Sequence, residues 1–129
     1  RLFPAANIFA VDNDPVSVRT AHENRQKNQI SVMKMRTILS EGFANRSVLR
    51  NGPYDLVMAN ILAGPLRRMA ADLARNLSLG GRLILSGLLH HQAQQLVGDC
   101  RAHKLTLVMR LDQDEWCCLV FRRMQRGRG

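Results

Sequence analysis

Short apolar segments alternate with amphipathic helical segments along the chain, and this alternation limits the possible folds more than any other feature. The first apolar segment, residues 8–11, is an unbroken run, as expected for a strand covered on both faces. A helix begins directly after it, with Asp14 as its cap and Pro15 in its first turn. Strands that alternate with helices in this way predict an α/β fold with a mostly parallel sheet and helices on both faces.

The rest of the chain follows the same order. We expect further strands at 32–39, 56–59, 79–89, 105–111 and 116–122, and further helices over 64–78 and 90–104. The strand centred on 56–59 is, like the first, a continuous apolar run of the type buried on both faces. The short polar segment 112–115 favours antiparallel pairing of the last two strands, so the sheet gains one C-terminal antiparallel strand. Without an internal repeat or linker, the sequence predicts a single domain over residues 1–129.

The chain is strongly basic, with a net charge of +9, which favours an acidic or nucleic-acid partner. Four of the positive charges are at its end: Arg122, Arg123, Arg126 and Arg128. Without these four the net charge falls to +5, and no aromatic side chains stand between them to stack on bases. Direct nucleic-acid binding is therefore one expectation for these arginines, and a solvated chain end is the alternative.

The cysteines and the hydropathy pattern favour a cytoplasmic protein. Cys100, Cys117 and Cys118 are odd in number, and two adjacent strand residues point to opposite faces, so a structural disulfide is not expected. No apolar run approaches the ~18 residues of a membrane span, and no leader resembles a secretion signal.

Three predicted strands end in polar residues suited to ligand binding. Ligands of open α/β sheets bind outside the carboxyl ends of the strands. This rule selects Asp12, the segment Ser40–Phe43 ("SEGF") and Asn60. We expect the three to open into one pocket along one rim of the sheet.

Asp12 is the candidate for binding a ribose, with Asn13 beside it. A carboxylate at a strand end can accept hydrogen bonds from two ribose hydroxyls, and such charge-assisted bonds are strong. The alternative is an acid that shares the capping of the following helix with Asp14.

The "SEGF" segment is the candidate for an adenine pocket. Glu41 or the backbone of Gly42 would bind the amino edge, with Phe43 packed nearby. The alternative is an ordinary loop.

Asn60 begins the segment with the most chemical information, "NILAGPL". Its carbonyl can accept from an amine while its amide donates elsewhere, and Leu62 and Pro65 can keep water away. The alternative is a helix cap.

No metal site is expected. His90 and His91 are adjacent in a helix, and the pair Cys100 and His103 lacks the second pair that would complete a zinc site.

Four segments together resemble the catalytic domain of the PrmA family, the bacterial methyltransferases of ribosomal protein eleven of the large subunit. These segments are "FAVDNDPVSVRTAHENRQKN", "YDLVMANILAGPL", "LSLGGRLILSGLL" and "DEWCCLVFRR". The resemblance implies a class I, Rossmann-like fold that uses S-adenosylmethionine to methylate lysine and α-amino groups of the ribosomal protein. It also implies that Asp12 binds the ribose, that Asn60 lies near the transferred methyl group, and that Ile61 and Leu62 line the substrate channel.

The resemblance also implies parts that would precede Arg1: the first strand, its "GxGxG" loop and a small N-terminal domain. We therefore expect the chain to be a fragment that is inactive by itself. Two other functions stay open: a class I methyltransferase for a glutamine, nucleic acid or small molecule, or a non-catalytic basic module that binds RNA. Ile61 and Leu62 stand where enzymes acting on planar amides carry a proline and an aromatic residue, which favours an alkylamine substrate.

Overall fold

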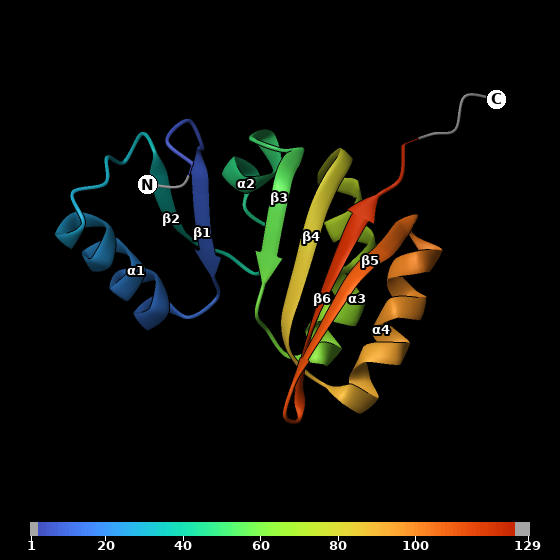
Figure 1. The fold of residues 1–129 in the computed structure, drawn as a ribbon. Helices are drawn as coiled ribbons and strands as arrows, with labels where there is room; N and C mark the ends of the chain where they lie inside the picture. Colours follow the sequence, from blue (N-terminus) through green and yellow to red (C-terminus); the bar gives the residue numbers. More distant parts are fainter. Residues whose placement is uncertain (1–2, 126–129) are drawn as a thin grey trace. The chain divides into compact units, whose positions relative to one another are not determined.

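A computed structural model describes residues 3–125 and divides the chain into two compact units (Figure 1). The N-terminal unit spans residues 1–50 and the C-terminal unit residues 51–129. The single domain expected from the sequence stays a prediction. No helix of the described residues is long and apolar enough to cross a membrane.

The N-terminal unit contains a β-α-β arrangement followed by a short helix. Its elements are β1 (Ile8–Asp12), α1 (Pro15–Lys27), β2 (Met35–Leu39) and α2 (Arg46–Arg50). The two strands are parallel, and Asp12 is paired with Leu39 at their carboxyl ends. As predicted, Asp14 caps α1: its side chain accepts from the backbone N–H of Val16 at 3.0 Å.

Two details of this unit differ from the prediction. The second strand begins at Met35 rather than at residue 32, because the carbonyl of Ser31 accepts from the N–H groups of Lys34 and Met35 and closes a turn there. The helix α2 was not predicted. Its start is held by Asn45, whose side chain accepts from the N–H of Ser47 at 2.8 Å.

The C-terminal unit is a mixed four-stranded sheet with two long helices. Its elements are β3 (Tyr54–Ala59), α3 (Ala63–Arg75), β4 (Leu77–Leu89), α4 (His90–Ala102), β5 (Leu105–Gln113) and β6 (Trp116–Arg123). The strand order is β3-β4-β6-β5; β3 is parallel to β4, and β6 is antiparallel to both of its neighbours. The antiparallel C-terminal strand is thus confirmed, and it lies between β4 and β5 (Figure 1).

The core of this unit is formed by one face of the sheet together with α3 and α4. Alternate residues of β4 and β6 are buried, as the period of two requires. The helices add buried residues at helical spacing. The core side chains include Leu66, Ala70 and Leu73 of α3, Leu83 and Leu85 of β4, Leu96 and Cys100 of α4, and Leu119 and Phe121 of β6.

The expectation of a strand buried on both faces at 56–59 was wrong. Leu56 is 44% exposed and Met58 is 72% exposed. The two side chains are two residues apart and so share one face of β3. Their neighbours in β4 are Arg82 and Ile84, whereas the buried Leu83 and Leu85 pair with Val57 and Ala59, so Leu56 and Met58 lie on the face of the sheet opposite the core.

Candidate functional site

Asp12 lies exposed at the carboxyl end of β1, as the sequence predicted. One carboxylate oxygen, Oδ1, accepts from the backbone N–H of Asp14 at 2.9 Å. The other oxygen has no hydrogen-bond partner among residues 3–125. Asp12 therefore supports the turn into α1 and still presents acceptor capacity to solvent, while Asn13 is exposed beside it.

Asp14 caps α1 by itself, whereas the alternative interpretation of Asp12 had the two acids share this capping. Hydrogen bonds from the backbone N–H of Val16 and the hydroxyl of Ser17 lower the pKa of its carboxyl group. Because Asp14 alone accepts from the first turn of α1, Asp12 is not needed as the helix cap.

The "SEGF" segment lies directly beside Asp12. The N–H of Ser40 donates to the carbonyl of Asp12 at 2.9 Å, which continues the pairing of β1 with β2. The hydroxyl of Ser40 donates to the carbonyl of Gly42 and accepts from the N–H of Asn45, at 3.1 and 3.0 Å. Ser40 thus fixes the shape of this loop, a role that the sequence analysis did not assign to it.

The cofactor-binding candidates of the loop differ in exposure. Glu41 is exposed, while Gly42 and Phe43 are half-buried. Gly42 has φ 55°, a left-handed conformation that glycine adopts without strain. The exposed carboxylate of Asp12 thus lies beside a loop that carries a second exposed carboxylate and one half-buried aromatic ring, and the assignment of this loop to adenine stays a prediction.

Asn60 follows β3 in the C-terminal unit and is exposed. The N-cap of α3 is Leu62, which makes no side-chain capping bond, so Asn60 is not the cap of this helix. Its side chain lies over the backbone of Gly87 in β4. A Cβ atom at Gly87 would overlap Asn60 Oδ1 and lie 3.4 Å from its Cγ.

Gly87 was not among the residues selected from the sequence. It lies where the pairing of β4 with β6 shifts register, between Leu85 and Leu88, and its φ is 73°. A glycine inside a strand pattern was the available signal, because it indicates a bulge or a close approach of another group.

The apolar residues after Asn60 face solvent in this unit. Ile61 is 40% exposed and Leu62 is 77% exposed, while Pro65 is half-buried in the first turn of α3. Their place beside Asn60 agrees with an apolar rim, although their role as a water-excluding wall stays a prediction.

The structure therefore brings Asp12 and the "SEGF" segment together in the N-terminal unit, and Asn60 and Gly87 together in the C-terminal unit. A single pocket containing both Asp12 and Asn60 stays a prediction.

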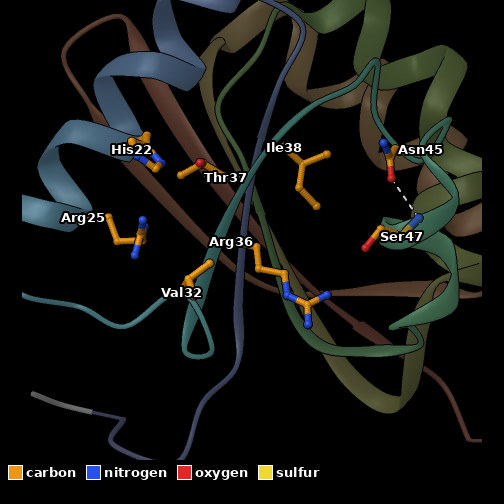
Figure 2. A pocket seen from close by; sticks show the side chains of 8 residues that line it. All are labelled: His22, Arg25, Val32, Arg36, Thr37, Ile38, Asn45 and Ser47. Carbon is orange, nitrogen blue, oxygen red and sulfur yellow. Dashed lines mark hydrogen bonds between the residues drawn. The ribbon is translucent and has the colours of Figure 1, made fainter.

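A hollow of about 330 Å³ in the N-terminal unit contains none of the predicted site residues (Figure 2). Its lining residues are His22, Arg25, Val32, Arg36, Thr37, Ile38, Asn45 and Ser47. Both of its arginines interact within the chain: Arg25 donates to the carbonyl of Ile30 at 2.9 Å, and Arg36 lies over the ring of Phe9 at 5.7 Å.

The other chemically reactive candidates have structural contacts. The ring of His90 lies 2.8 Å from the carbonyl of Asp114 and 2.9 Å from the guanidinium of Arg110, so it joins α4 to the β5–β6 hairpin. Burial raises the pKa of Cys100 to about 12, which keeps its thiol protonated and unreactive. Among residues 3–125, no three His, Cys, Asp or Glu side chains are grouped so that they could hold a metal.

Three arginines of the basic surface already have partners within the chain. Arg67 forms an ion pair with Asp99 at 2.6 Å, and Arg75 pairs with Asp72. Arg123 donates to the backbone carbonyls of Arg75 and Leu77, where α3 ends. The predicted basic tail continues through Arg126 and Arg128, which lie outside the described residues.

Comparison with known proteins identifies the family. The family described as "Ribosomal protein L11 methyltransferase (PrmA)" matches residues 1–124. A ribosomal protein L11 methyltransferase of Bradyrhizobium diazoefficiens is 44% identical over 117 residues, which are 91% of this chain and 39% of that protein. One of Chelativorans is 39% identical over 116 residues, covering 90% of this chain and 40% of its own length. The chain thus spans about two fifths of these curated relatives.

Solved structures show the same fold. A ribosomal protein L11 methylase of Lactobacillus delbrueckii matches with a TM-score of 0.81 and 24% identity, covering 92% of this chain and 59% of that one. A methyltransferase of Pyrococcus furiosus matches with a TM-score of 0.74 and 15% identity, covering 92% and 64%. The predicted α/β fold of class I methyltransferases is confirmed by these likenesses. With the match over residues 1–124, the chain belongs to the ribosomal protein L11 methyltransferase (PrmA) family.

Proposed function

We propose that this chain is part of a cytoplasmic, S-adenosylmethionine-dependent N-methyltransferase that modifies lysine and α-amino groups of ribosomal protein L11. The observation that carries the proposal is the family match over residues 1–124, within which polar residues follow the parallel strands β1 and β3. Asp12 follows the first of these strand ends and Asn60 the second.

The cofactor would be held by the carboxyl end of the β1–β2 pair. The carboxylate of Asp12 would accept from the ribose hydroxyls, and Asn13 lies next to it. Glu41 and the backbone of Gly42 would bind the adenine amino group, with Phe43 against the ring. Since Ser40 fixes this loop and binds the carbonyl of Asp12, the two halves of the nucleoside site are held together before the cofactor binds.

When bound, S-adenosylmethionine supplies a methyl group on a positive sulfur: the amine lone pair forms the N–C bond, and the C–S bonding pair leaves with sulfur as a thioether. The chain's own contribution is alignment, since the leaving group is already good. The Oδ1 atom of Asn60 would accept a hydrogen bond from the substrate amine and so direct its lone pair.

The substrate amine must be neutral, although a lysine has a usual pKa of about 10.4. An apolar surrounding lowers the pKa of an amine because it disfavours the charged form. Leu62 and Pro65, which follow Asn60, would provide this surrounding. The proton released by the amine passes to solvent.

RNA binding without catalysis is the less favoured function. Arg67 and Arg75 of α3 are engaged in ion pairs, and Arg123 binds backbone carbonyls. These contacts occupy part of the arginine face on which such a module would depend.

The direct test uses the full-length gene product with S-adenosylmethionine carrying a labelled methyl group. We expect label on L11, located by peptide mass spectrometry on lysine side chains and the N-terminal amine. L11 whose amines have been chemically blocked is the matched control and should stay unlabelled. Label on ribosomal RNA instead, or on the amine-blocked protein, would contradict the proposal.

A further inference from the structure

We propose that Gly87 is a positioning residue for methyl transfer, because the space above its backbone holds the amide of Asn60. This inference rests on the proposed function, in which Asn60 directs the substrate amine. It concerns β4, a strand from which the sequence analysis selected no site residue.

The geometry identifies the requirement. A Cβ atom built on Gly87 would overlap Asn60 Oδ1 and lie 3.4 Å from Cγ, so no side chain can occupy position 87 while Asn60 keeps its place. Gly87 is itself exposed, so burial in the core does not explain its small size. The atom that a side chain at position 87 would displace is Asn60 Oδ1, the oxygen proposed to accept a hydrogen bond from the substrate amine.

The backbone conformation alone does not require glycine at this position. Gly87 has φ 73°, but Gln29, Lys104 and Asp114 of the same chain have φ values of 53°, 64° and 53°. A left-handed residue with a side chain is therefore tolerated elsewhere in this protein. Steric contact with Asn60 is the additional reason for glycine at position 87.

The bulge in β4 explains how the two residues meet. The pairing of β3 with β4 places Ala59 opposite Leu85, and the register of β4 against β6 shifts between Leu85 and Leu88. Gly87 lies within that shift, beside Asn60, which directly follows Ala59. At this bulge the side chain of Asn60, just after the end of β3, lies against the bare backbone of Gly87.

The predicted consequence of Gly87→Ala is a displaced Asn60 amide in a protein that still folds. Displacing a group that aligns reactants by about 1 Å can cost on the order of 100-fold in rate. We expect kcat of the full-length gene product to fall on that order, with the KM for S-adenosylmethionine changed little, because the nucleoside is assigned to Asp12 and the "SEGF" segment.

Gly80→Ala is the matched control. Gly80 also lies in β4 and has φ 78°, but a Cβ atom there would meet only Arg122 and Gln125 side-chain atoms at 3.6 and 3.7 Å, which is ordinary contact. The two variants carry the same kind of backbone strain. Their melting temperatures should fall by similar amounts, and kcat should fall only for Gly87→Ala.

A double-mutant cycle with Asn60→Ala tests whether Gly87 acts through Asn60. In the Asn60→Ala background the added Gly87→Ala change should lower kcat no further, since the amide that it displaces is gone. An equal fall in both backgrounds would overturn the inference.

A structural measurement separates this inference from the proposed function. Crystal structures of the wild-type and Gly87→Ala proteins should show Asn60 Oδ1 displaced while β4 on either side superposes. An unmoved Asn60 overturns the inference whatever the activity. A wild-type protein that transfers no methyl group to any acceptor would refute the proposed function, and with it the positioning role of Gly87.

Discussion

The backbone N–H of Ser40 donates to the carbonyl of Asp12 at 2.9 Å, just where the paired strands β1 and β2 end. This bond holds two residues that are 28 positions apart in the sequence side by side at the carboxyl edge of the β1–β2 pair. The carboxylate of Asp12 and the loop that begins at Ser40 share this edge. In the proposed function, this carboxylate would bind the ribose of the cofactor and this loop its adenine.

Asp12→Asn tests the ribose assignment. Asparagine keeps an acceptor for the N–H of Asp14 but removes the negative charge, so the turn into α1 should survive while the charge-assisted bonds to the ribose are lost. We expect the Kd for S-adenosylmethionine, measured by calorimetry on the full-length gene product, to rise about 10- to 100-fold. Glu23→Gln removes the same charge from exposed α1 and should leave the Kd unchanged; an unchanged Kd in Asp12→Asn would refute the assignment.

Asn60→Ala tests the assignment of the amine-directing residue. Loss of the acceptor should lower kcat on the order of 100-fold, because only alignment in the transition state is removed. The Kd for S-adenosylmethionine should change far less. Single-turnover kinetics on L11, with Asn24→Ala of exposed α1 as the control, separates the two quantities. If turnover held steady, Asn60 would lose this role.

Asp14→Ala tests the cap of α1 through its pH dependence. Hydrogen bonds from Val16 and Ser17 lower the pKa of Asp14 in the folded state, so its stabilising contribution is present above the usual aspartate pKa and is lost as pH falls through the lowered value. The variant should therefore unfold at lower urea concentration than wild type at neutral pH, and the difference should vanish in acid. Circular dichroism follows the unfolding. Glu23→Ala, on the same helix but outside the cap, should show no such pH-dependent difference.

Leu85→Ala tests the core of the C-terminal unit. Leu85 is fully buried in β4, so its truncation leaves a cavity and should lower the free energy of unfolding by about 2 to 5 kcal/mol. Leu79→Ala is the matched control in the same strand. Because Leu79 is 56% exposed, its truncation should lower the free energy of unfolding much less. Denaturant titrations measure both. Equal losses would mean that β4 is not packed as described.

The local features of this protein could be predicted because their causes lie within a few residues. Asp14 and Pro15 start α1, and the spacing of Leu66, Ala70 and Leu73 makes α3 amphipathic. The polar segment between β5 and β6 is short enough to fix their antiparallel pairing. The position of Asp12 at a strand end followed from the same local pattern.

Local sequence patterns were thus enough to predict the strands, the three long helices, the cap of α1, and the polar residues at the strand ends. Three features could be learned only from the three-dimensional structure: β6 lies between β4 and β5, Leu56 and Met58 are exposed, and Asn60 lies over Gly87. These three features depend on which distant segments pair and in which register. Periodicity within a segment reports which face is apolar, but not which neighbour will cover it or where a bulge will bring two residues together.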